Sequence, residues 1–120
     1  MVNNFVNDCD AVGISQYKAT NSIIMGNRIY GAGAEGITVD GTKRSRVVAN
    51  CIVACGRTGA VGGMGVDAAY ENTIANNLIV GTLNNLPGIC LESQAANTHH
   101  NAIVGNTILD NTGHGIWVLS

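Results

Sequence analysis

Short runs of alternating aliphatic and polar residues recur along the whole chain, separated by Gly, Asn, Ser and Asp. Ile14-Ser-Gln-Tyr17 and Ile37-Thr-Val-Asp40 are typical examples. Alternation with a period of two over a few residues predicts short β-strands, each with one apolar and one polar face. Asn, Gly, Ile, Val and Thr abound, whereas aromatic residues are only 4% of the chain. The pattern therefore predicts an all-β protein with many turns.

The strand pattern recurs together with asparagines that are spaced 23–29 residues apart. The element [Ser/Asn]-x-[Ile/Val]-x-x-Asn-x-[Ile/Val] occurs as Ser22 to Ile29, Ser45 to Ile52, Asn72 to Ile79 and Asn101 to Ile108, with a truncated copy at Asn4-Phe-Val6. Its asparagines, at 4, 27, 50, 77 and 106, are 23, 23, 27 and 29 residues apart. A second element, Gly followed by Ile or Val, occurs at Gly13, Gly36, Gly65, Gly88 and Gly115. Two landmarks with a common repeat of 23–29 residues indicate a solenoid.

Stacking is what such a repeat requires, because one short coil cannot bury its own apolar face. Coils about 4.8 Å apart would align the repeated aliphatic residues in three inward columns. These are Ile29, Ile52, Ile79 and Ile108; Ile24, Val47, Ile74 and Ile103; and Ile14, Ile37, Val66, Ile89 and Ile116. Asn27, Asn50, Asn77 and Asn106 would stack as a ladder of amides joined by hydrogen bonds. We expect about five coils.

These motifs resemble the short β-helix repeats of the pectate-lyase-like superfamily over residues 4–119. The resemblance implies a right-handed parallel β-helix and a polysaccharide as partner. The superfamily includes lyases, hydrolases, epimerases and phage tailspikes, so that the resemblance specifies the architecture better than the activity.

Length and charge narrow the class of protein. The 120 residues form one expected domain, 1–120, with a net charge of −2. Lys43, Arg44 and Arg46 lie close together. The chain lacks the broad basic stripe with interleaved aromatic residues that is typical of nucleic-acid binding, so we do not expect a nucleic-acid partner. The apolar runs are too short to span a membrane, and the first residues lack a signal peptide. Neither end carries a polar cap, which predicts a segment of a longer solenoid or an oligomer joined through its ends.

The four cysteines could suggest disulfides and one glycine motif a dinucleotide site, but the positions of these residues argue against both. Cys9 and Cys55 would lie two coils apart, roughly 10 Å, beyond the limit of about 7 Å for a disulfide. We expect four free thiols, no metal site and no cofactor. Gly31-Ala-Gly-Ala-Glu-Gly36 matches G-x-G-x-x-G, but it leads into a strand rather than a helix, which excludes a dinucleotide site. The histidines form no recognisable catalytic set.

Acidic residues gather on one outward face of the predicted Gly-Ile strands. Counting from each glycine, the second and fourth residues face outward: Ser15, Thr38, Asp67, Cys90 and Trp117, then Tyr17, Asp40, Ala69, Glu92 and Leu119. Asp40 and Asp67 would be offset by two residues, about 8 Å apart, and Asp40 and Glu92 roughly 9.6 Å. Inverting glycosidases hold their acid and base about 6.5–9.5 Å apart, so these three carboxylates are the candidate catalytic residues.

Further features would complete such a site. Tyr17 and Trp117 could stack on sugar rings at either end of it. Two insertions, 56–65 and 92–100, lengthen particular coils, and insertions often gather on a binding face. Asp40 and Asp67 would bind calcium only if backbone oxygens completed the ligand shell. Equally, these are the ordinary solvated carboxylates of an exposed sheet.

Three classes of function remain open. The first is a structural, carbohydrate-facing segment of a larger surface or phage tailspike-like protein. The second is a polysaccharide-processing hydrolase, lyase or epimerase, and the third a self-assembling filament subunit. The sequence does not decide whether the protein is an enzyme, and it leaves the location open, a virion or extracellular surface being compatible with it.

Overall fold

A computed structural model describes residues 1–58, 61–92 and 98–119. Within these residues the chain forms three parallel sheets and no helix. The front sheet comprises β2 (Ile14–Tyr17), β5 (Ile37–Asp40), β8 (Met64–Asp67), β11 (Ile89–Glu92) and β14 (Ile116–Val118). The β3 sheet comprises β3 (Ile23–Met25), β6 (Arg46–Val48), β9 (Thr73–Ala75) and β12 (Ala102–Val104). The β1 sheet comprises β1 (Phe5–Asn7), β4 (Arg28–Tyr30), β7 (Cys51–Val53), β10 (Leu78–Val80) and β13 (Thr107–Leu109).

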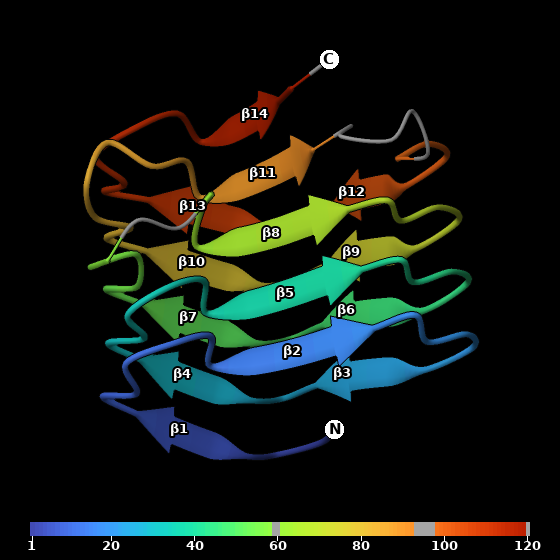
Figure 1. Ribbon diagram of the computed structural model, residues 1–120, viewed down its shortest axis with the longest axis horizontal. Coiled ribbons are helices and arrows are strands. Elements are labelled where there is room, and N and C mark those ends of the chain that lie inside the picture. The colour runs from blue at the N-terminus through green and yellow to red at the C-terminus, as the bar shows by residue number, and fades with distance from the viewer. Residues whose placement is uncertain (59–60, 93–97, 120) are drawn as a thin grey trace.

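The chain climbs as a solenoid from the N-terminus at the bottom of Figure 1 to the C-terminus at the top. The front sheet faces the viewer, and the β3 and β1 sheets lie behind it with their strands running in the opposite direction (Figure 1). Each strand pairs with the equivalent strand of the next coil, so that neighbours in a sheet are never consecutive in the sequence. The predicted all-β solenoid of stacked parallel strands is confirmed, whereas its right-handedness stays a prediction.

Two of the three predicted inward columns are confirmed. Ile29, Ile52, Ile79 and Ile108 are direct partners across the β1 sheet, and Ile24, Val47, Ile74 and Ile103 across the β3 sheet. The third column is wrong at one position: Met64, and not Val66, aligns with Ile37 and Ile89. Val66 instead aligns with Val39 and Leu91. The apolar core lies between the three sheets, where the side chains of the central coils are almost fully buried. Leu91, Ile103 and Ile108, nearer the C-terminal end, are partly buried.

The predicted asparagine ladder is confirmed, and a second one runs beside it. Asn27, Asn50 and Asn77 each donate a side-chain hydrogen bond of 2.9 Å to the amide oxygen of the asparagine in the next coil. The second ladder uses the first position of the same sequence element, in which the Ser45 backbone N–H donates to Asn72 Oδ1 at 2.9 Å. Both ladders satisfy buried polar groups at corners between sheets, where strand pairing is interrupted.

At the corners of each coil, the chain changes direction through residues in the left-handed backbone conformation. One corner column contains Asn3, Gly26, Ala49, Asn76 and Gly105, and another contains Asp8, Gly31, Ala54, Gly81 and Asp110, all with positive φ. Gly, Asn and Asp adopt this conformation most readily and occupy eight of these ten positions, the other two being Ala49 and Ala54. Repeated corners of one type keep successive coils in register.

A column of glycines precedes the front-sheet strands, at positions 13, 36, 63, 88 and 115. A Cβ at Gly36 would lie 2.4 Å from Ile52 Cγ2, and one at Gly63 would lie 2.6 Å from Thr82 Oγ1 and 3.0 Å from the Gly88 carbonyl oxygen. At Gly36 and Gly63 the chain therefore passes close to the core and to the next coil, leaving no space for a side chain. None of the described segments forms a helix long and apolar enough to cross a membrane.

Candidate functional site

The three candidate carboxylates lie in a single outward column of the front sheet. Asp40 pairs directly with Asp67, and Asp67 pairs with Glu92. The predicted offset of two residues between Asp40 and Asp67 is therefore wrong. Their strands are adjacent, which brings the two backbones to within about 5 Å. Ala69, predicted in the same outward column, is fully buried in the core.

A small hollow opens over this column, which we call the acidic hollow. It has a volume of about 150 Å³ and is lined by Glu35, Thr38, Asp40, Val61, Gly65, Val66, Asp67 and Glu92. Four of the eight lining residues are carboxylates, and none is a cation. Because the chain has eight acidic residues in total, half of them converge on this one hollow.

Glu35 and Gly65 give the hollow its shape. The backbone N–H of Val61 donates a hydrogen bond of 3.0 Å to Glu35 Oε1, which fixes the carboxylate. The Glu35 Cγ lies 3.3 Å from where a Cβ of Gly65 would be, so the side chain extends over the gap in the outward face that this glycine leaves. Sequence reasoning missed Glu35, because it precedes the strand and is out of step with its alternation.

Two oxygen atoms at the hollow lack a hydrogen-bond partner among the described residues. They are Thr38 Oγ1 and Asp67 Oδ1, and both atoms are buried. Buried polar atoms are nearly always paired, and those that are not call for a partner such as a ligand or a water molecule. Glu92 is also buried, at 5% exposure. The carboxylates of the hollow accept hydrogen bonds, and the Thr38 hydroxyl can both donate and accept.

The two aromatic residues predicted at the ends of the site occupy different columns. Tyr17 is 62% exposed and pairs with Asp40, so that it continues the carboxylate column into the preceding coil. Lys18 Nζ lies 4.8 Å from its ring centroid. Trp117 is 42% exposed and pairs with Cys90, in the neighbouring outward column. Its indole lies 5.7 Å from the His114 ring.

Both predicted insertions border the hollow. Val61 belongs to the first insertion, 56–65, and Glu92 begins the second, 92–100. Residues 59–60 and 93–97 of these insertions lie outside the described residues. The described parts agree with the expectation that insertions gather on one face.

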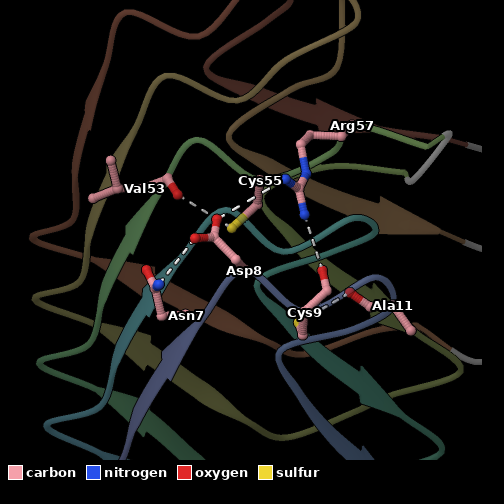
Figure 2. Close-up of polar contacts among 7 residues, drawn as sticks. All are labelled: Asn7, Asp8, Cys9, Ala11, Val53, Cys55 and Arg57. Carbon is pink, nitrogen blue, oxygen red and sulfur yellow. Dashed lines mark hydrogen bonds and ion pairs between the residues drawn. The ribbon is translucent and has the colours of Figure 1, made fainter.

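The four thiols are free, as predicted. Figure 2 shows Cys9 and Cys55 engaged separately: Cys9 Sγ donates to the Ala11 carbonyl at 3.4 Å, and Cys55 Sγ to the Val53 carbonyl at 3.5 Å. Burial raises the pKa of the Cys55 thiol. Burial, reinforced by the charges of Glu92 and Glu35, raises the pKa of Cys90 to about 11. These two thiols therefore remain protonated, and unreactive as nucleophiles, at neutral pH.

Two adjacent histidines bring their ring nitrogens close together. His99 Nδ1 and His100 Nδ1 lie 2.6 Å apart on exposed side chains, and the His99 ring stacks on Tyr70 with centroids 5.1 Å apart. No third His, Cys, Asp or Glu joins them: within the described part of the chain, no group of three or more such side chains is arranged to hold a metal ion.

Comparison with known proteins identifies the family but no individual relative. No curated protein and no solved structure matches the chain. The model of the NosD family, described as a periplasmic copper-binding protein, matches residues 1–87. This match covers more than half of the 120 residues and most of the coils described above. The chain, a parallel β-helix segment, therefore belongs to the NosD family.

Proposed function

We propose that this β-helix is a carbohydrate-facing segment of a larger surface or tailspike-like protein, and that the acidic hollow is its sugar-binding site. The observation that carries the proposal is the set of hydrogen-bond acceptors in the hollow: four carboxylates, with the buried oxygens Thr38 Oγ1 and Asp67 Oδ1 lacking partners among the described residues. Sugar hydroxyl groups are donors that match such acceptors. The sequence resemblance to the pectate-lyase-like superfamily, still a prediction, supports the same class of ligand.

The charge of the hollow selects among sugars. A uronic acid or a sulfated sugar would bring a further negative charge toward four carboxylates, with no cation among the lining residues to offset it. A neutral sugar avoids this repulsion and donates hydrogen bonds to charged acceptors, which are stronger than neutral ones. We therefore expect neutral hexoses or amino sugars as ligands. Tyr17 offers an aromatic face at the start of the column.

A glycan array followed by calorimetric titration of the best neutral oligosaccharide tests this proposal. Asp67→Asn removes one central charged acceptor, and we expect it to weaken binding about tenfold or more. Asp110→Asn is the matched control, because Asp110 is exposed at a corner outside the hollow and asparagine tolerates its φ of 51°. Unchanged affinity in Asp67→Asn, or a preference for acidic glycans at this face, would contradict the proposal.

A polysaccharide-processing enzyme is the second candidate, favoured by the direct pairing of Asp40 with Asp67. Adjacent coils hold the two backbones about 5 Å apart, from which the carboxyl groups can reach the separation of about 5–5.5 Å used by retaining glycosidases. Asp40 and Glu92, two coils apart, are nearer to the inverting separation. Release of reducing sugar that is abolished by Asp40→Asn but retained by Asp110→Asn would favour this candidate over binding alone.

The described residues offer no group of three or more His, Cys, Asp or Glu side chains for the copper described for the family. Copper sites use thiolate, thioether or imidazole ligands in convergent sets. The thiols of Cys55 and Cys90 are buried and their pKa values are raised, which opposes the thiolate form that a metal needs. The pair His99 and His100 supplies two ligands without a third among the described residues. We derive no copper chemistry from this arrangement.

A further inference from the structure

A second hollow, of opposite charge, lies on another sheet. It has a volume of about 340 Å³ and is lined by Asn21, Ser22, Ile23, Arg44 and Arg46, and we call it the arginine hollow. Ile23 of β3 pairs directly with Arg46 of β6, so the hollow spans two neighbouring coils. It contains two of the chain's six basic residues and no acidic one.

Both arginines are exposed, on either side of a buried serine. Ser45, which separates them, is 1% exposed and points into the second ladder, where its Oγ lies 2.8 Å from Ser22 Oγ. Arg44 lies at a left-handed corner with a φ of 51°, and Arg46 begins β6. Both side chains are exposed and line the same hollow. Only Ser45 separates the two residues, so their two long side chains can close on one group.

The charge of these arginines is not neutralised by the protein. The single ion pair among the described residues joins Arg57 to Asp8, at 3.9 Å, and includes no residue of this hollow (Figure 2). Glu71 follows Arg44 in the next coil but forms no ion pair with it. Lys43, beside the hollow, has its Nζ 6.0 Å from the Tyr70 ring centroid. Two guanidinium groups therefore face solvent without a carboxylate partner.

We propose that the arginine hollow binds an oxyanion, a sulfate, phosphate or carboxylate group, carried on a sugar. Guanidinium groups present parallel N–H donors that match two oxygens of such a group. The Asn21 side chain, at the hollow's edge, can add a further donor. Ile23, 37% exposed, gives the hollow an aliphatic wall against which the carbon face of a sugar ring can pack.

This site is independent of the acidic hollow, from which it differs in sheet and in charge. The acidic hollow repels an anionic sugar, whereas the arginine hollow attracts one. Because the net charge of the chain is −2, attraction depends on the local pair of arginines and not on the field of the whole molecule. Both arginines are exposed, so salt screens the attraction, with a Debye length of about 8 Å at 0.15 M.

The experiment is a titration at low and at physiological salt with sodium sulfate, sodium phosphate, sodium glucuronate and glucose 6-sulfate, with glucose as the neutral reference. Amide chemical shifts report the site and the affinity. We expect the sulfated sugar to bind more tightly than free sulfate, and Arg44→Gln and Arg46→Gln each to weaken binding about tenfold. Comparison of the anions identifies which oxyanion the hollow prefers.

Arg28→Gln is the matched control, because Arg28 is an exposed arginine of β4 without an ion pair among the described residues. Arg44→Lys keeps the charge but loses the paired donors, so an intermediate affinity is expected even if the glutamine variants fold poorly. The proposal is overturned if no anion binds at low salt, if the double glutamine variant binds as the parent does, or if Arg28→Gln weakens binding equally.

Discussion

At the scale of single residues, buried amides decide how the coils are joined. Asn50 is 1% exposed and uses every hydrogen-bonding group of its side chain. Its Nδ2 donates to Asn77 Oδ1 and to the Ile24 carbonyl, and its Oδ1 accepts from the backbone and side-chain N–H groups of Asn27. One residue thus satisfies polar groups of three successive coils. An aliphatic residue of similar size would fill the space but leave those groups unpaired.

We predict that Asn50→Ala lowers the free energy of unfolding by about 3 kcal/mol or more, since it leaves two buried N–H donors of Asn27 without an acceptor and removes one donor from the Ile24 carbonyl. Asn7→Ala is the control: Asn7 is exposed and bonds only to the neighbouring Asp8, so we expect a change within about 0.5 kcal/mol. Denaturant unfolding measures both. Equal losses in the two variants would show that the ladder contributes little.

At the scale of the elements, the glycines that precede the central front-sheet strands lie where a side chain would not fit. Gly36, Gly63 and Gly88 each precede a front-sheet strand, and each has core side chains or the next coil where a Cβ would be. Gly81 is different: it has a φ of 65° and nothing within 4 Å of that position. The first group is required by close packing, whereas Gly81 is required only by backbone conformation.

The same substitution at the two kinds of glycine should therefore have different effects. We predict that Gly63→Ala costs about 3 kcal/mol, because the carbonyl of Gly88 and the side chain of Ile79 cannot both move away. Gly81→Ala should cost about 1 kcal/mol, as Ala54 already occupies the equivalent left-handed corner. Thermal and denaturant unfolding provide the comparison. A cost at Gly81 that matches or exceeds the cost at Gly63 would refute this account of the glycine column.

At the scale of the whole molecule, stacking turns single residues into charged surfaces. The acidic hollow and the arginine hollow arise because residues of successive coils align, not because they are close in the sequence. The solenoid also buries two thiols whose pKa values are raised, which couples folding of the whole chain to alkaline pH.

The pH dependence follows from the direction of these shifts. The pKa of Cys90 is about 11 in the folded chain against an ordinary value of 9.0, so the folded state holds this proton more tightly than the unfolded state. Its contribution to stability is complete below about pH 9 and is lost as the pH rises toward 11. We predict that Cys90→Ser, which removes the titrating thiol, makes the fall in unfolding free energy between pH 9 and 11 less steep. An unchanged slope would mean that the thiol titrates alike in both states.

The sequence alone predicted the solenoid, the asparagine ladder, two of the core columns and the four free thiols. Each of these depends on the residue's own type and on a fixed offset from a landmark, which the repeat makes visible. Asp40, Asp67 and Glu92 were likewise assigned to one outward face, because strand alternation determines which side of the sheet a residue occupies.

Only the tertiary structure decided how those carboxylates pair. The segment Gly63-Met-Gly-Val66 offers two glycines, each followed by an apolar residue, and a shift of two residues leaves every side chain on the same face of the sheet. Alternation therefore cannot distinguish Gly63 from Gly65 as the start of the strand. Packing does: the space beside the core at Gly63 excludes a Cβ, and this choice pairs Asp67 with Asp40 and leaves Gly65 beneath Glu35.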